Sequence, residues 1–305
     1  MKNKIIYITG RGHSGSTILD LVLGNKFNSI SFGEFVSGVS RYKEQFCSCG
    51  MNILECPFWS TVINEIEKRG LSFDRFSFIV YKYSNILQFY KLYFNKQLYE
   101  EFKIYHSVFF EIINNLFDKD LFIDSSKEPS RSLFYYSVFS NSFVIHLVRN
   151  PFDVVASTFK RVKKGESVNF LRKKLTPTKF NKVLIVSLFS FNWFIGNLMI
   201  EIFKLFMAKD RYIIFSYDRF IKNPAKELKN LDNNFKLGLD DVIFKVSNGE
   251  NLDINHTLGG NRIRFKKSFV LSPSIFSEKL SPFYICLVFL FTFPLYFFYK
   301  LKKLF

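Results

Sequence analysis

Cysteine, proline, glycine and acidic side chains are all scarce in this sequence. Only 4 of the 305 residues are cysteine, too few for a disulfide-stapled scaffold, so the fold must depend on a hydrophobic core. The 14 glycines and 8 prolines exclude a collagen-like or low-complexity chain. With 26 acidic against 43 basic residues, the formal net charge is +17. This charge favours an anionic partner: a phosphate ester, a sulfated or acidic glycan, nucleic acid or anionic lipid.

Apolar residues are abundant, at 48% of the chain, and 41 residues are phenylalanine. They are spread along every predicted helix and strand rather than gathered in one basic stretch. We therefore interpret the aromatic bias as core filling and not as a base-stacking surface. A chain of this length can bury the core of one large domain.

Short apolar runs predict five strands, separated by long helical patterns, over residues 5–8, 29–32, 121–124, 143–148 and 212–215. This layout is typical of an α/β fold with three layers, in which helices flank a central parallel sheet. We expect one domain over residues 1–280, with a helical insertion at about 60–118. Residues 1–10 lack the apolar core of a secretory signal, which favours a cytoplasmic protein.

Two further segments stand out by composition. Residues 161–182 are rich in lysine and arginine with little periodicity, which indicates either a mobile basic loop or a solvated surface. Residues 283–299 carry no charge and include Pro294. For this apolar segment in residues 281–305, a membrane-contacting helix competes with a buried terminal helix that ends near the proline.

The sequence GRGHSGST, Gly10 to Thr17, leaves the first predicted strand and opens a helix. Its backbone N–H groups and the positive end of the helix can surround a phosphate, so we expect a P-loop-like fold. A nucleoside-triphosphatase loop would have lysine where this chain has Ser16. The missing lysine argues against ATP hydrolysis and favours a nucleotide with a different anion at its 5′ end. An ordinary glycine turn is the alternative.

Four motifs occur in an order that resembles sulfotransferases using 3′-phosphoadenosine 5′-phosphosulfate (PAPS). They are HSGST at His13, SFGEF at Ser31, DSSKEPSR at Asp124 and HLVRNPFDVVAS at His146. The resemblance covers about residues 4–265 and is greatest to the bacterial and tyrosylprotein-type branch. It implies PAPS as co-substrate and 3′-phosphoadenosine 5′-phosphate as product.

The resemblance also implies catalytic roles for Glu34, Lys127 and His13. Glu34 follows a glycine after the second predicted strand and would be the general base. Lys127 follows the third and would stabilise the leaving nucleotide. His13 stands where related enzymes have arginine or lysine, and either an imidazolium or a neutral hydrogen-bond donor fits there. The alternatives are an N-capping or surface glutamate and a solvated lysine.

The nucleotide contacts implied by the resemblance fall into two groups. Arg149 and Ser157 suit the 3′-phosphate, provided that the chain between them folds back. Tyr217, Asn261 and Arg262 would be secondary contacts to the nucleotide, and Arg264 is a further candidate. Alternatively, Tyr217 is a core residue and the two arginines are surface charges. The 5′-phosphosulfate would be held by Arg11, Gly12, His13, Ser14, Gly15, Ser16 and Thr17.

Cys47, Cys49 and Cys56 form a separate cluster in CSCGMNILECPFW. Three cysteines do not complete a tetrahedral zinc site without a fourth ligand. Free thiols or one cysteine pair are the expectation, and we predict no metal.

Three functions remain open from the sequence. The first is a PAPS-dependent sulfotransferase acting on a hydroxyl or amine of a carbohydrate, lipid or peptide, with membrane-surface contact through residues 283–299 and no nucleic-acid partner. The second is a P-loop kinase for a nucleotide or small molecule. The third is a non-enzymatic basic protein that binds nucleic acid or membrane. Only the first explains why the phosphate loop, Lys127 and the Arg149–Ser157 pair occur together.

Overall fold

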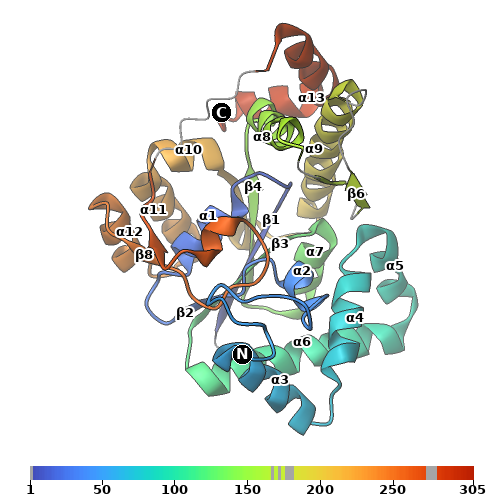
Figure 1. Cartoon of the computed structure of the whole chain (residues 1–305), viewed down its shortest axis with the longest axis vertical. Helices are drawn as coiled ribbons and strands as arrows, with labels where there is room; N and C mark the ends of the chain where they lie inside the picture. Colours follow the sequence, from blue (N-terminus) through green and yellow to red (C-terminus); the bar gives the residue numbers. More distant parts are fainter. Residues whose placement is uncertain (1–2, 166–167, 171–172, 176–181, 273–279) are drawn as a thin grey trace.

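The structure is a computed structural model, and it describes residues 3–165, 168–170, 173–175, 182–272 and 280–305. Its centre is a parallel sheet of five strands in the order β2-β3-β1-β4-β7 (Figure 1). The strands are β1 Lys4–Gly10, β2 Ser29–Ser31, β3 Leu121–Lys127, β4 Ser142–Val148 and β7 Tyr212–Ser216. The predicted α/β fold with a central parallel sheet is therefore confirmed.

Helices cover both faces of the sheet because successive side chains of β1 point to opposite sides. Ile5 and Tyr7 join one apolar core, and Ile6 and Ile8 join the other. The first core is covered by α2 Phe35–Val39, α3 Pro57–Lys68, α4 Phe73–Tyr83, α5 Ile86–Phe94, α6 Lys96–Phe117 and α7 Pro129–Val138. The second is covered by α1 Ser16–Leu23, α10 Tyr217–Lys222, α11 Pro224–Phe235 and α12 Asp240–Ser247.

The segment predicted to be a helical insertion holds α3 to α6, which lie between β2 and β3 along the chain. Its aromatic side chains pack on one another: the rings of Phe35 and Phe109 have centroids 4.8 Å apart, and Trp59 and Phe32 lie beside them. All four are buried. In this part of the molecule the phenylalanine bias fills the core, as the sequence indicates.

The basic stretch 161–182 is only partly described. Its first residues are the end of α8 Pro151–Lys163, followed by a small antiparallel pair, β5 Val168–Phe170 and β6 Lys173–Leu175. Of the two alternatives from the sequence, a basic loop is therefore wrong for these parts, whereas a solvated charged surface agrees with the exposed Arg161 and Lys164. Residues 166–167, 171–172 and 176–181 lie outside the described residues.

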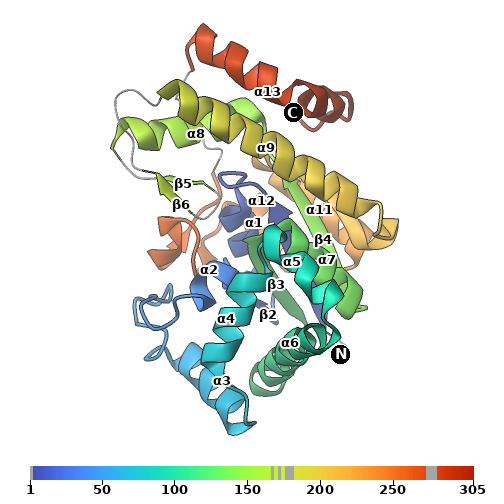
Figure 2. The same cartoon turned by 90° about the vertical axis from the view of Figure 1, so that its right-hand side faces the viewer.

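Three helices stack at the end of the molecule opposite α3 and α6 (Figures 1 and 2). They are α8, α9 Lys182–Lys204 and α13 Pro282–Leu301. The last helix continues through Pro294, so the expected end near the proline is wrong. Both α9 and α13 are long and apolar enough to cross a membrane, but each packs on the other and is partly buried.

The remaining described elements are short and lie mainly near the second core. They are β8 Leu252–Asp253, β9 Ser268–Phe269 and the 3₁₀ helices η2 Lys209–Arg211 and η3 Arg262–Phe265. The pair β8 and β9 is antiparallel and flanks the segment that carries Asn261 and Arg262. This segment leads back toward the carboxyl ends of the central strands.

Candidate active site

A cavity of about 620 Å³ opens where β1 and β3 end and α1 begins. In parallel sheets, ligands bind at the carboxyl ends of the strands, where neighbouring connections diverge to opposite faces. Here β1 lies between β3 and β4, and its two neighbours are both later in the chain. The cavity is lined by Gly10, Arg11, Gly12, Glu34, Val36, Ser37, Ser40, Arg41, Tyr81, Ser126, Lys127 and Glu128.

The phosphate loop keeps its shape through left-handed backbone and close packing. His13 and Gly15 have positive φ angles of 66° and 93°, and the amide of Ser14 donates to the carbonyl oxygen of Arg11 at 3.1 Å. A Cβ on Gly15 would lie 2.0 Å from the ring of Tyr217, so only glycine fits. The loop then passes directly into α1, whose N-cap is Gly15. A helix N-terminus in this setting can bind an anion.

His13 is neutral at pH 7. Burial, together with the nearby cations Lys127 and Arg161, lowers its pKa to about 4. Of the two roles that the sequence left open, the imidazolium is therefore disfavoured in the structure, and a neutral hydrogen-bonding group remains.

Arg11 lines the cavity, and the end of its side chain extends to α9. Its guanidinium donates to the side chain of Asn192, and burial lowers its pKa. A Cβ on Gly196 would lie 2.1 Å from Cδ of Arg11, so this glycine makes room for the arginine. Asn192 and Gly196 are one helical turn apart and face the same side. The sequence analysis missed this contact, although a glycine among bulky residues of a long helix is a signal for close approach.

Glu34 and Lys127 meet in the cavity. The ammonium of Lys127 donates to Oε1 of Glu34, and both side chains are about one-fifth exposed, at 20% and 19%. Glu34 occupies the N-cap position of α2, but its side chain makes no capping bond. Its amide donates to the carbonyl oxygen of Leu258 at 2.7 Å. The glutamate therefore faces the lysine and does not serve as a helix cap.

The backbone at Lys127 is itself unusual. Its φ angle is 71°, a left-handed conformation that costs a non-glycine residue about 1 kcal/mol or more. Thr9 at the end of β1 donates its hydroxyl to the carbonyl oxygen of Lys127 at 3.2 Å. Such strain is typical of functional positions that the surrounding structure holds in place.

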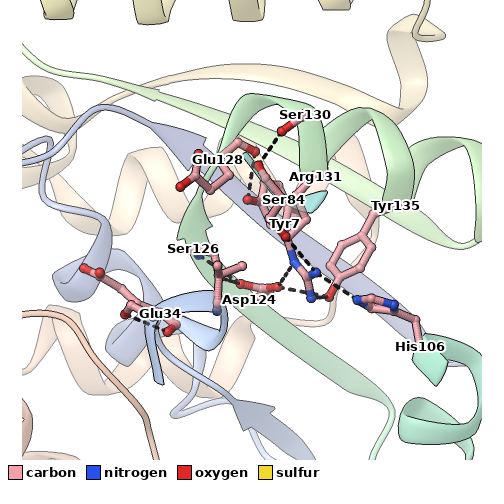
Figure 3. A network of polar contacts seen from close by, with 12 residues as sticks. Tyr7, Glu34, Ser84, His106, Asp124, Ser126, Glu128, Ser130, Arg131 and Tyr135 are labelled. Atoms are coloured by element: carbon pink, nitrogen blue, oxygen red, sulfur yellow. Dashed lines mark hydrogen bonds and ion pairs between the residues drawn. The ribbon is translucent and has the colours of Figure 1, made fainter. Parts of the chain in front are cut away.

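A buried polar network centred on Asp124 and Arg131 lies near Glu34 (Figure 3). Nε of Arg131 donates to Oδ2 of Asp124 at 2.9 Å, and the hydroxyl of Tyr135 donates to the same oxygen at 3.0 Å. The hydroxyl of Ser126 donates to Oδ1 of Asp124 and accepts from the amide of Val36 at 2.9 Å. Asp124 thus fixes the end of β3 relative to the start of α2, and so fixes Lys127 relative to Glu34.

The outer part of this network ties it to the helices of the insertion. His106 on α6 accepts from Nη1 of Arg131 at 2.8 Å and donates its Nδ1 proton to the carbonyl oxygen of Phe102 at 2.7 Å. Burial beside the arginine lowers the pKa of His106 well below its usual value. The sequence analysis used DSSKEPSR only for its lysine; a charged pair inside an otherwise buried motif could have pointed to Asp124 and Arg131.

Arg149 reaches the phosphate loop from the end of β4. Its Nη1 donates to the carbonyl oxygen of His13 at 3.0 Å, and its guanidinium lies 4.9 Å from the centre of the Tyr217 ring. The indole of Trp193 on α9 donates to the carbonyl oxygen of Arg149 at 3.1 Å. Ser157 is half-buried on α8, and no described hydrogen bond joins it to Arg149. Their joint role stays a prediction.

The late segment around Asn261 closes on α1. The amide of Asn261 donates to the hydroxyl of Thr17 at 3.3 Å, and Arg262 next to it is exposed. Arg264 differs: it is buried, and its Nη1 donates to the carbonyl oxygens of Phe46 and Thr257. The expectation that Arg264 contacts nucleotide is therefore not supported by its position.

No protein-family model matches the sequence, and no curated protein matches it. The fold is similar to the sulfotransferase domain from the curacin biosynthetic pathway, with 15% identity, a TM-score of 0.50, and coverage of 93% of this chain and 96% of that domain. The sulfotransferase domain from the Synechococcus PCC 7002 olefin synthase is also 15% identical, with a TM-score of 0.48 and coverage of 95% and 96%. At these identities the likeness concerns the fold, which is that of a sulfotransferase domain.

Proposed function

We propose that the protein is a PAPS-dependent sulfotransferase that acts on a hydroxyl or amine group. The observation that carries the proposal is the pairing of Glu34 with Lys127 in a cavity beside a phosphate loop that lacks the P-loop lysine. The fold is compatible with this reaction. The missing lysine argues against the alternative, a P-loop kinase.

The proposed reaction needs a base at the acceptor oxygen and a cation at the bridging oxygen of PAPS. Lys127 would therefore exchange its ion pair with Glu34 for a contact with the bound co-substrate, which would leave the carboxylate of Glu34 to the acceptor. A bond forms between the acceptor oxygen and sulfur while the bond from sulfur to the bridging oxygen of PAPS breaks. Glu34 takes the acceptor proton. The electron pair of the broken bond stays on the 5′-phosphate of the leaving 3′-phosphoadenosine 5′-phosphate, and Lys127 stabilises that charge.

The remaining residues would bind and orient the co-substrate. The amides of Gly15, Ser16 and Thr17 would face the 5′-phosphosulfate at the start of α1. His13 would donate a hydrogen bond to the phosphosulfate. Its pKa is lowered to about 4 without a ligand, and a bound anion would raise that pKa. Arg149, with Ser157, would hold the 3′-phosphate, and Tyr217, Asn261 and Arg262 would complete the nucleotide pocket.

The side of the cavity proposed for the acceptor is lined by residues of α2, of the turn that follows it, and of α4. Arg41 and Tyr81 lie on the cavity wall together with Glu34. A guanidinium and an aromatic ring suit a sugar or peptide that carries an acidic group. We propose an anionic glycan, lipid or peptide as the acceptor class.

The test is calorimetric titration of the full chain, followed by a transfer assay. We expect 3′-phosphoadenosine 5′-phosphate to bind and ATP to bind more weakly, and labelled sulfonate to pass from PAPS to a member of a glycan, lipid and peptide panel. Tighter binding of ATP would favour the kinase. Salt-sensitive binding of nucleic acid without nucleotide binding would favour the non-enzymatic alternative.

We also propose that α13 lies on an anionic membrane surface. Its buried side packs on α9, whereas Phe289, Leu290 and Phe293 are exposed at 43%, 70% and 46%. A groove of about 630 Å³ on this helix is lined by such side chains and by Lys300 and Lys303. An apolar helix face bordered by lysines is complementary to acyl chains below anionic headgroups.

A further inference from the structure

Three cysteines and a histidine from two distant segments of the chain lie together in the fold. Cys47, Cys49 and Cys56 precede α3, and His256 lies 200 residues after Cys56. The three thiols are free. All four ligand atoms, three Sγ and the Nδ1 of the histidine, lie within 4.8 Å of one another.

Three of the six separations between these atoms are close to the edges of a tetrahedron around one metal ion. Sγ of Cys49 and Sγ of Cys56 are 3.7 Å apart, and Nδ1 of His256 lies 3.5 Å from Sγ of Cys47 and 3.2 Å from Sγ of Cys56. A tetrahedral zinc with bonds of about 2.3 Å to sulfur and about 2.0 Å to nitrogen requires edges of about 3.8 Å between sulfurs and about 3.5 Å between sulfur and nitrogen. The other three separations are at most 4.8 Å.

The two buried cysteines of the cluster lie near backbone amides. The amide of Cys49 is close to Sγ of Cys47, and the amides of Phe58 and Trp59 are close to Sγ of Cys56, which occupies the N-cap position of α3 without a side-chain capping bond. Burial raises the pKa of the Cys47 and Cys56 thiols, so metal binding at this place would release their protons.

The histidine is oriented by contacts on both its ring and its backbone. Its ring stacks on Phe58 with centroids 5.5 Å apart and planes within 5° of parallel. The indole of Trp59 donates to the carbonyl oxygen of His256 at 2.9 Å. Arg264, bound to the carbonyl oxygens of Phe46 and Thr257, places a cation beside the thiolates. Metal ligands are commonly held by such outer contacts.

We propose that Cys47, Cys49, Cys56 and His256 form a structural zinc site. Three soft thiolates and one imidazole in tetrahedral arrangement select zinc among the common divalent ions. Because the protein supplies all four ligands, no position is left for substrate, and the role is structural rather than catalytic.

The zinc would hold the late segment against the site. Two residues beyond His256, the carbonyl oxygen of Leu258 accepts from the amide of Glu34, and the amide of Leu258 donates to Phe32. The same segment continues to Asn261, which contacts Thr17. Anchoring His256 to the cysteines would therefore position Glu34, the proposed base, and Asn261, which lies against the phosphate loop at Thr17.

The test is metal analysis of the full chain purified without chelator, which does not depend on sulfotransfer. We expect one zinc per chain and, after exchange, the visible absorption of tetrahedral cobalt bound to thiolates. Cys49→Ser and His256→Ala should each lower metal affinity by at least about 100-fold, since loss of a mere outer partner of a ligand already costs about 10- to 100-fold. Cys286→Ser, at an exposed cysteine on α13, should leave metal content unchanged.

Two results would overturn the proposal. One is wild-type protein that contains no zinc and takes up neither zinc nor cobalt under reducing conditions. The other is a Cys49–Cys56 disulfide found by mass spectrometry in protein that is folded and free of metal. A chelator that removes zinc should also lower the melting temperature of the wild type, which keeps the proposal testable if a variant fails to fold.

Discussion

Glu34 is the residue on which the proposed chemistry depends most. Replacing it by glutamine keeps the shape of the side chain but removes the carboxylate that would accept the proton. We expect Glu34→Gln to lower turnover by about 10²- to 10⁴-fold and to change nucleotide affinity far less. Steady-state transfer rates and calorimetry on the same preparation measure the two effects. The exposed Glu44 gives a matched control, Glu44→Gln, with normal turnover.

Equal losses of turnover and nucleotide affinity in Glu34→Gln would contradict this role, because they would mean that Glu34 supports the nucleotide pocket and does not act on the acceptor. Normal turnover would exclude Glu34 as the base.

Replacing Arg149 should lower nucleotide affinity more than turnover, the opposite of the effect expected for Glu34→Gln. Its guanidinium lies against the phosphate loop through the carbonyl oxygen of His13, at a place suited to a phosphate. A hydrogen bond to a charged group is worth about 1.5–3 kcal/mol, so we expect Arg149→Ala to weaken binding of 3′-phosphoadenosine 5′-phosphate by at least about tenfold. Arg69→Ala, which removes a surface ion pair with Glu111, is the control. Unchanged affinity for this nucleotide would exclude Arg149 from the 3′-phosphate site.

At the scale of single elements, α13 carries the prediction about membranes. The double variant Leu290→Ser, Phe293→Ser should bind vesicles that contain phosphatidylserine about tenfold or more weakly than the wild type. Each CH₂ group buried in the membrane is worth about 0.8 kcal/mol. Co-sedimentation measures this binding. Phe94→Ser, which removes a ring on α5 that is 87% exposed, more than either replaced side chain, should have no effect. Equal sedimentation of wild type and the double variant would contradict a membrane role for this face.

The strands and helices differ in how well the sequence predicts them. All five strands of the sheet follow from short apolar runs, because a parallel strand is buried on both faces. The pair β5 and β6 was missed, since it lies in a basic stretch without alternation. The sequence pattern did not predict that α13 continues through Pro294. The helix continues because its buried side chains, among them Val288, Thr292 and Leu295, pack on α8 and α9.

For the whole molecule, Asp20 predicts an unusual dependence of stability on pH. This carboxyl group on α1 is buried and accepts from the hydroxyl of Ser31 at 2.6 Å. Burial, with the negative charges of Asp124 and Glu34 nearby, raises its pKa to about 8. The folded protein therefore keeps a proton that the unfolded chain releases near pH 3.8.

The free energy of unfolding should reflect that proton. Asp20 lowers stability progressively as the pH rises from 3.8 to about 8, by up to about 1.4 kcal/mol per pH unit. Asp20→Asn removes this term, so its stability relative to wild type should be greater at pH 8 than at pH 5. Denaturant unfolding at several pH values measures the difference, with Asp120→Asn at an exposed ion pair as control. Parallel curves for wild type and Asp20→Asn would contradict the assigned protonation.

The site as a whole was only partly predictable. The phosphate loop, Glu34 and Lys127 are local to strand ends and so were visible in the sequence. The contacts that hold them are not local: Asn192 meets Arg11, His106 meets Arg131, and His256 meets Cys56. Such pairs depend on helix packing between segments far apart in the chain, which no sequence pattern specifies. The direction of the Arg11 side chain, toward α9, likewise depends on how α9 packs against the phosphate loop.

The position of α9 has a mechanical consequence. One side of this helix contacts Arg11 and the backbone of Arg149, while Glu201 near its end accepts from the hydroxyl of Tyr299 on α13. Helix α9 thus connects the face proposed to rest on lipid with Arg11 of the phosphate loop and with Arg149 at the end of β4. If α13 lies on a bilayer as proposed, α9 would set the distance of the cavity from that bilayer, and acceptors whose reactive group protrudes to that distance would be favoured.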